Sequence, residues 1–229
     1  MGRTFVLGDV HGAYRALIQC FERSGFQRDN DTLICLGDIC DGWPETKRCV
    51  DELLRIKNLI YVFGNHDLWL LRWMKTGDIE NIWYVQGGEA SIHSYAGHPA
   101  PVEHIQFFEK AVPYYLQENK LFVHAGIDPS VSLEKQSEAI FLWDRSMVRK
   151  ALNHFVKGEQ MKLSSFDEIY VGHTPTSYGR PIKACEVWLM DTGAGWSGQL
   201  SMMDIDSKES FISEDVPSLY PGIKGRSRN

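Results

Sequence analysis

The sequence predicts an α/β protein, in the broad sense that includes α+β, built as a sandwich of mixed sheets flanked by helices. Three apolar strands alternate with three helices over residues 4–74, and this βαβαβα order favours parallel strands joined by crossover helices. Residues 114–126 instead show a hairpin, and residues 182–206 show two strands joined by a loop, and both patterns favour antiparallel pairing. The chain has 229 residues and 43% hydrophobic content, enough for one substantial core, so we expect a single domain over residues 1–229.

The three early strands share one form, an apolar or β-branched run without helical period that leads into glycine and then Asp or Asn. They are residues 4–7, 32–36 and 59–63. The helix after the first strand carries an apolar stripe and is expected to end at Gly25. Pro44 suits the first turn of the second helix, and residues 67–74 form a third helix with an aromatic face.

The rest of the chain is less regular. Residues 77–101 are rich in glycine, proline and aromatic residues, and we expect them to form an excursion along one wall of a cleft. Residues 102–112 return to helix, and a hairpin turns at Glu118–Asn119. Residues 132–157 are mostly helical, and residues 182–206 are predicted to form two antiparallel strands joined by a glycine-rich loop.

Composition excludes several classes of partner. A net charge of −6 and a pI near 5.7 argue against a general binder of nucleic acid or of anionic membranes. No apolar run approaches the roughly 20 residues that span a bilayer, and the first residues lead straight into a strand rather than a signal peptide. The five cysteines form no CxxC pair. We therefore expect a cytoplasmic protein, and the oligomeric state stays open.

Polar side chains stand where five of the predicted strands end. They are Asp9, His11, Asp38, Asn65, His124 and His173. Carboxylate, amide and imidazole donors together suit two divalent ions such as Mn, Fe or Zn, and the carboxylate of Asp38 can bridge both. Two such ions roughly 3.5–4 Å apart clamp a phosphate group and lower the pKa of a water between them, which becomes the nucleophile. The sequence thus predicts a dinuclear metal site at one sheet edge.

His66 follows Asn65 and is left over as a candidate general acid for the leaving oxygen. Asp41, three residues after Asp38, could orient this imidazole and fix its tautomer. We expect these two side chains to be catalytic without holding a metal.

Five short motifs occur in the order seen in one known family. They are GDVHG, GDICDGW, GNHD, HAG and GHT, over residues 8–174. The set resembles the phosphoprotein phosphatase family of calcineurin-like metallophosphoesterases, whose pattern is GDxHG, GDxxDRG, GNHE or GNHD, HGG or HAG, and GHT. The stretches WYVQGGEASIHSY, HAGIDP, FLWDR and DTGAG resemble the short bacterial and phage branch, which includes serine/threonine protein phosphatases and diadenosine tetraphosphatases.

The resemblance implies a four-layer β-sandwich of mixed sheets flanked by helices, and it implies roles for the site residues. The first metal falls to Asp9, His11 and Asp38, and the second to Asp38, Asn65, His124 and His173. It also implies His66 as the acid with Asp41 behind it, Asn65 near the substrate phosphate, and manganese as the metal we expect first.

The sequence departs from this family at two arginines. Gly42 stands where GDxxDRG has arginine, and Phe63 precedes GNHD where many members have another. Arg145, in FLWDR, is the best remaining candidate to bind the substrate phosphate. Residues 145–183 carry an excess of positive charge, which could supply more through Arg180 or Lys183.

The resemblance and the predicted site together indicate a metal-dependent phosphoester hydrolase. A serine/threonine protein phosphatase or promiscuous phosphomonoesterase, acting on phosphoproteins or small phosphoesters, is the first choice. A symmetrical diadenosine tetraphosphate hydrolase is the nearest alternative. A catalytically weak phosphate-binding or scaffolding protein is the second alternative, because two phosphate-binding arginines are missing.

Overall fold

Two mixed sheets of five strands each stack face to face over residues 2–96 and 99–226, the part of the chain that this computed structural model describes. The first sheet has the order β10-β9-β1-β2-β3. Its strands are β1 (Thr4–Leu7), β2 (Thr32–Cys35), β3 (Asn58–Tyr61), β9 (Ser201–Asp204) and β10 (Ser210–Ile212). β1, β2 and β3 run parallel, and β9 and β10 add antiparallel pairing on the other side of β1.

The second sheet has the order β4-β5-β6-β8-β7. Its strands are β4 (Tyr114–Gln117), β5 (Lys120–Val123), β6 (Glu168–Val171), β7 (Ile182–Ala184) and β8 (Val187–Leu189). β5, β6 and β8 are parallel neighbours, and β4 and β7 pair antiparallel at the two edges. Each sheet therefore contains three neighbouring parallel strands, whose carboxyl ends can gather polar side chains.

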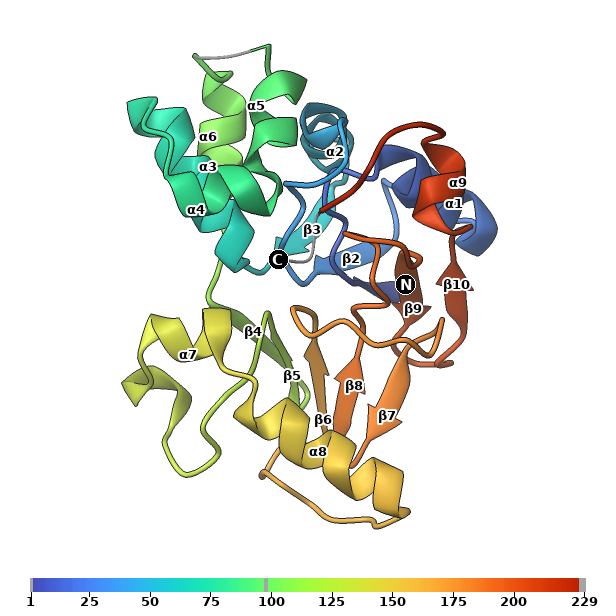
Figure 1. Cartoon of the computed structure of the whole chain (residues 1–229). Helices are drawn as coiled ribbons and strands as arrows, with labels where there is room; N and C mark the ends of the chain where they lie inside the picture. Colours follow the sequence, from blue (N-terminus) through green and yellow to red (C-terminus); the bar gives the residue numbers. More distant parts are fainter. Residues whose placement is uncertain (1, 97–98, 227–229) are drawn as a thin grey trace.

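Helices cover the outer face of each sheet (Figure 1). On the first sheet lie α1 (Tyr14–Ser24), α2 (Thr46–Leu53), α3 (Asn65–Thr76), α4 (Asn81–Trp83), the π-helical turn η1 (Tyr84–Gly88), α5 (Glu89–Ser94) and α6 (Val102–Glu109). On the second lie the 3₁₀ turn η2 (Leu133–Lys135), α7 (Glu138–Trp143) and α8 (Ser146–Lys157). The short helix α9 (Val216–Leu219) packs near α1.

Alternate residues of the central strands enter different layers of the core. In β1, Phe5 and Leu7 pack under the helices, whereas Val6 faces the other sheet. In β5, Val123 packs toward α8 and Phe122 faces the first sheet. Both faces of each sheet are thus buried, which gives the sequence of layers helix, sheet, sheet, helix and confirms the predicted fold class.

Most predicted elements are confirmed, including the hairpin turn, where Glu118 and Asn119 both have positive φ. Two details differ. Pro44 lies before α2 rather than in its first turn. The described part of 77–101 is largely helical: α3 ends at its C-cap Gly77, and after a non-helical stretch α4, η1 and α5 run from Asn81 to Ser94 with a kink at Gly87 (φ 110°). No helix in the described ranges is both long and apolar enough to cross a bilayer.

The prediction for residues 182–206 is wrong in its pairing. Cys185 (φ 55°) reverses the chain early, so β7 and β8 form their own tight hairpin in the second sheet. The glycine-rich loop then crosses to the first sheet, where β9 pairs with β1 instead of β8. The sequence shows two strands and a loop, but it does not show which sheet receives each strand.

Candidate metal centre and catalytic site

The six side chains predicted at strand ends meet at one edge of the sandwich. They form two groups, one of Asp9, His11 and Asp38 and one of Asp38, His124 and His173, and within each group the donor atoms lie within 4.8 Å of one another. The Oδ1 atom of Asn65 lies 3.0 Å from Nε2 of His124, so Asn65 belongs to the second group. All members are buried, and Asp38 is common to both groups.

Hydrogen bonds to backbone carbonyls fix the imidazole tautomers. Nδ1–H of His124 donates to the carbonyl oxygen of Leu36 at 2.7 Å, and Nδ1–H of His11 donates to that of Cys40 at 2.9 Å. The Nε2 atoms therefore carry lone pairs, and both face Oδ2 of Asp38, at 3.5 Å from His124 and 3.8 Å from His11. Metal-binding histidines usually donate their other ring N–H to a carbonyl or carboxylate in this way.

The backbone at these positions is bent into a region that ordinary residues avoid. His11, Asp38 and His173 have φ of 52°, 50° and 59°. Left-handed conformations at residues other than glycine are uncommon and cluster at functional sites. The close turn also requires glycine at position 37, where an added Cβ would lie 2.6 Å from the backbone nitrogen of Gly64.

The electrostatics of the site favour cations. Burial and the nearby carboxylates of Asp191 and Asp38 raise the pKa of Asp9 well above its usual value. Burial also raises the pKa of Asp191, to about 7. For Asp38 burial acts in the same direction, but the surrounding imidazoles, His124 first, outweigh it and lower its pKa. Several carboxylates buried together are stabilised by positive charge, and a divalent ion supplies it.

Unpaired polar atoms mark the same place. Among the described residues, the buried side-chain atoms without a hydrogen-bond partner include Oδ1 of Asp9, Nε2 of His173 and Oδ2 of Asp191. Buried polar atoms normally have partners, so a cluster of three at one site fits atoms that are kept for metal ions. Asp191 lies two residues beyond the end of β8, in the DTGAG stretch, where reasoning from strand ends could have found it.

Asp67 is a site residue that the sequence reasoning missed. Its carboxylate accepts hydrogen bonds from the backbone nitrogens of Asp38, Ile39 and Gly64 at 2.9, 3.1 and 2.9 Å. The hydroxyl of Tyr61 donates a fourth at 2.8 Å. Asp67 thereby fixes the turn that presents Asp38, which explains the acidic residue after His66 in the GNHD stretch.

His66 and Asp41 form the predicted pair. Nδ1–H of His66 donates to Oδ2 of Asp41 at 2.7 Å, and both side chains are buried. Two further donors hold the carboxylate: the indole N–H of Trp83 bonds Oδ2 at 2.8 Å, and the hydroxyl of Ser91 bonds Oδ1 at 2.7 Å. Trp83 and Ser91 come from the 77–101 excursion, so this segment forms a wall of the site as expected and also orients the pair.

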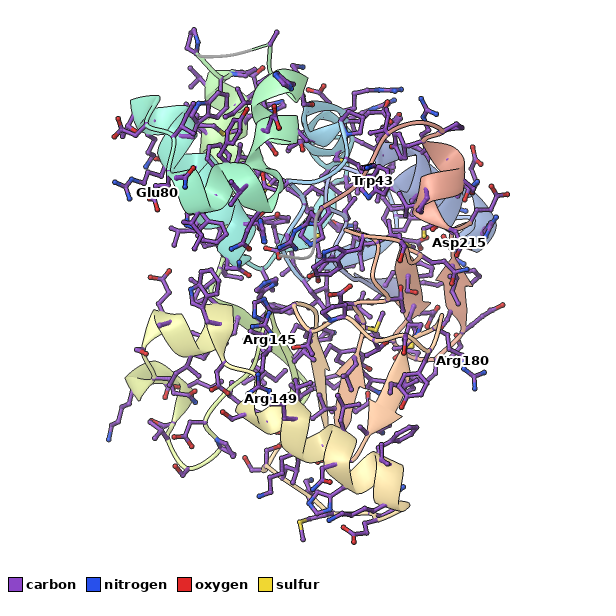
Figure 2. The ribbon with its side chains drawn as sticks, viewed as in Figure 1. Trp43, Glu80, Arg145, Arg149, Arg180 and Asp215 are labelled. Atoms are coloured by element: carbon purple, nitrogen blue, oxygen red, sulfur yellow. The ribbon has the colours of Figure 1, made fainter. Side chains whose placement is uncertain are left out.

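The basic residues that were predicted to bind the phosphate differ in their distance from the site. Arg145 lies at the site, with Nη2 3.4 Å from the carbonyl oxygen of His173. Lys183 instead pairs with Glu168 at 3.2 Å, and Figure 2 shows Arg180 at the margin of the molecule, far from Arg145. The suggestion that Arg180 or Lys183 supplies charge to the site is therefore wrong. Arg226, which lies outside all of the sequence motifs, reaches the site instead, with Nη1 3.2 Å from Nε2 of His11.

A buried set of carboxylates and imidazoles around a shared aspartate, beside an imidazole held by a carboxylate, defines the class of metal-dependent hydrolases. Residues 2–177 match the model of the calcineurin-like phosphoesterase family, and the chain belongs to that family. It is accordingly a hydrolase of the metallophosphoesterase type, a class that works with divalent metal ions.

Relatives carry two kinds of name. The chain is 27% identical to serine/threonine-protein phosphatase 1 of Salmonella typhimurium, over 88% of this chain and 91% of the relative. It is also 27% identical to the asymmetrical bis(5'-nucleosyl)-tetraphosphatase of Halalkalibacterium halodurans, over 98% of this chain and 97% of the relative.

Solved structures share the fold. A proposed diadenosine tetraphosphatase superposes with a TM-score of 0.69 at 18% identity, covering 92% of both chains. A protein serine/threonine phosphatase from Saccharomyces cerevisiae superposes with a TM-score of 0.64 at 15% identity, covering 99% of this chain and 84% of the other.

Proposed function

We propose that this hydrolase removes phosphate from phosphoserine and phosphothreonine side chains of proteins and also accepts small phosphomonoesters. The observation that carries the proposal is the position of Asp38, which is shared by two donor groups and adjoins the His66–Asp41 pair. The backbone N–H of His66 donates to Oδ1 of Asp38 at 2.9 Å, so the acid and the shared carboxylate are held in one unit.

The donor groups suggest two cation sites. One is formed by Asp9, His11 and Asp38, and the other by Asp38, Asn65, His124 and His173. Their mixture of oxygen and nitrogen donors suits manganese, with iron or zinc as the other metals that we expect to bind. When bound, two divalent cations supply Lewis-acid polarisation of the phosphate and lower the pKa of an attacking water.

His66 suits the role of general acid. Because Asp41 holds Nδ1–H, the other ring nitrogen is directed away from Asp41 and can deliver a proton to the leaving oxygen. A serine or threonine alkoxide is a poor leaving group that needs this proton, whereas a nucleotide phosphate leaves with little assistance. A well-supported acid therefore favours alkyl monoesters over phosphoanhydrides.

Two other side chains suit the substrate phosphate. The Oδ1 atom of Asn65 faces His124, which leaves its amide N–H groups available to donate to a phosphoryl oxygen. Arg145 is half-buried beside His173 and offers a guanidinium, the group that binds phosphate oxygens in pairs.

One observation favours a second candidate, the symmetrical hydrolysis of diadenosine tetraphosphate. The ring of Trp69 lies 5.1 Å from that of His66 and 5.3 Å from that of Trp143. Trp143 is 39% exposed, so an aromatic surface borders the acid and is able to stack a nucleobase.

A comparison of substrates tests the proposal. With manganese added, we expect kcat/KM for a phosphothreonine peptide to exceed that for diadenosine tetraphosphate by at least about 10-fold, because protonation by His66 accelerates the departure of the alkoxide and adds little for a phosphate leaving group. The Asp38→Asn variant serves as the inactive control for contaminating phosphatases. A preference for the dinucleotide, lost selectively in Trp143→Ala, would contradict the proposal and support the second candidate.

A further inference from the structure

We propose that Arg226, near the C-terminal end of the chain, binds the substrate phosphate on the His11 side of the site, in the space beside Gly42. The inference rests on the proposed function and adds a residue that specifies how the phosphate is bound. It concerns a side chain 52 residues beyond Thr174, the last residue of the motifs that define the site.

The C-terminal segment is anchored on Trp43. From α9 the chain turns back across the molecule toward the site (Figure 1). The ring of Tyr220 stacks on that of Trp43 with centroids 5.1 Å apart, and Trp43 is itself fixed by its indole N–H, which donates to the carbonyl of Ala194 at 2.7 Å. Gly225 passes so close that an added Cβ would lie 2.7 Å from the Trp43 ring. Trp43 therefore acts as the platform on which this segment lies.

The Arg226 side chain is held on several sides. Its backbone N–H donates to the carbonyl of Gly195 at 2.9 Å. Nε donates to the carbonyl of Gln86 at 3.0 Å, and Nη2 to the Gln86 side chain at 3.3 Å. The guanidinium carbon lies 4.6 Å from the ring centre of Trp196, a distance typical of cation–π contact. A guanidinium ordered in this way loses less entropy when it binds a phosphate.

Gly42 makes room for this arrangement. An added Cβ at Gly42 would lie 2.8 Å from Cγ of Arg226, so a long side chain at position 42 and the observed Arg226 exclude each other. Gly42 also has φ of 112°, where other residues are strained. The GDxxDRG arginine is therefore replaced in this chain by two features together, a glycine at 42 and an arginine from the C-terminal segment.

The direction of the guanidinium fits a phosphate. Nη1 of Arg226 donates to Nε2 of His11. This nitrogen carries the lone pair that His11 would give to a cation in the proposed site. A bound cation takes that lone pair, and Nη1 then needs another acceptor, which a phosphoryl oxygen provides. Arg145 lies beside His173 in the other donor group, so two guanidiniums stand at opposite ends of the site.

The rival interpretation is a plug, in which Arg226 competes with the cation for His11 and slows the enzyme. Arg226→Ala distinguishes phosphate binding from the plug, because it removes the guanidinium that each interpretation requires. The substitution should leave the fold intact, since Arg226 is half-buried and lies outside any helix or strand. Lys224→Ala is the matched control, since it removes one positive charge from the same segment. Metal content is measured for each protein, together with the dissociation constant of inorganic phosphate by calorimetry and the KM and kcat for p-nitrophenyl phosphate.

We expect Arg226→Ala to bind two metals per chain, as wild type does, but to bind inorganic phosphate about 10- to 100-fold more weakly, with a parallel rise in KM. Millimolar guanidinium should restore part of the loss, and Arg226→Lys should fall between, because lysine keeps the charge without the fork. The Lys224→Ala control should match wild type.

Unchanged phosphate affinity in Arg226→Ala would overturn the inference. Tighter metal binding with faster turnover would also overturn it and would identify Arg226 as a plug. Failure of the proposed function has a different signature, in which wild type binds phosphate through Arg226 but hydrolyses no phosphomonoester.

Discussion

Oδ2 of Asp41 lies 2.7 Å from Nδ1 of His66, and this contact is buried beneath the α4–α5 wall. It ties the His66 imidazole to a carboxylate that is itself held by a tryptophan and a serine. The proposed role of His66 as general acid can therefore be tested separately from that of the proposed metal ligands.

His66→Asn should slow hydrolysis of alkyl phosphates far more than that of aryl phosphates. Loss of a general acid costs about 10²- to 10⁴-fold where the leaving group needs a proton, and an aryl oxide needs little. The measurement is the ratio of kcat values for phosphothreonine peptide and p-nitrophenyl phosphate, with metal content measured in parallel. His104→Asn is the control, because buried His104 forms a second His–Asp pair with the exposed carboxylate of Asp51 (2.9 Å), and it should leave the ratio unchanged. An equal fall for both substrates would assign His66 to the phosphate or the metals.

Ser91→Ala should loosen Asp41 and lower both stability and rate. The Ser91 hydroxyl accepts from the backbone N–H of Asp41 at 2.9 Å and donates to its carboxylate, so its removal leaves buried groups unpaired. We expect a loss of about 1–3 kcal/mol in the free energy of unfolding, measured in urea, with a lower kcat for the phosphopeptide. Ser94, on the same helix, accepts a hydrogen bond from the backbone N–H of Lys47 instead, so Ser94→Ala should spare the rate. Equal effects of both serines on kcat would refute the specific role of Ser91.

Asp38→Asn should weaken both cation sites together. The substitution removes a charge common to the two donor groups, so metal affinity should fall by more than the roughly 10- to 100-fold typical of outer-shell changes. Metal per chain, measured after dialysis by atomic emission, checks this expectation. Asp31→Asn, at a carboxylate paired with Arg3, is the control. Retention of two tightly bound ions in Asp38→Asn would rule out the shared ligand.

Glu168→Gln tests acid stability away from the site. Burial raises the pKa of Glu168, but hydrogen bonds from Lys208, Tyr170 and Trp188 outweigh it and lower the value from 4.5 to about 2. As pH falls, Glu168 is therefore protonated in the unfolded chain before it is protonated in the folded protein. The ionised carboxylate stabilises the fold fully above pH 4.5, and this stabilisation is lost as pH falls toward 2. The variant should be about 1–3 kcal/mol less stable at pH 7 and should lose less stability than wild type between pH 4.5 and 2. Urea unfolding at several pH values measures both.

Glu118→Gln provides the contrast for that experiment. Glu118 is exposed and lies 3.5 Å from Lys120, an ion pair of the kind that contributes little. Its substitution should change neither the stability at pH 7 nor the slope with pH. A wild-type pH profile in Glu168→Gln would mean that other carboxylates control acid unfolding.

The sequence predicted the parts of this molecule that depend on short stretches of chain. A strand followed by glycine and a polar residue is a local pattern, so Asp38, His124 and the other donors could be assigned to strand ends. The sheet assignment of β9 could not, because pairing with β1 joins residues almost 200 positions apart. Arg226 was missed for the same reason, since contacts between residues distant in sequence, such as the stacking of Tyr220 on Trp43, bring it near His11.

The two sheets meet at the site through polar contacts as well as through their apolar faces. The backbone N–H of His173, from the second sheet, donates to Oδ2 of Asp9, from the first, at 2.9 Å. If cations bind as proposed, the second would be held from both sheets, by Asp38 and Asn65 from the first and by His124 and His173 from the second. Its ligand spacing would therefore change with any shear between the sheets. A small void opened in the inter-sheet core, for instance at Val6 or Phe122, would then alter the spacing of the ligands before it unfolds the chain. Metal affinity at the proposed site would therefore depend on how well the two sheets of the sandwich are aligned.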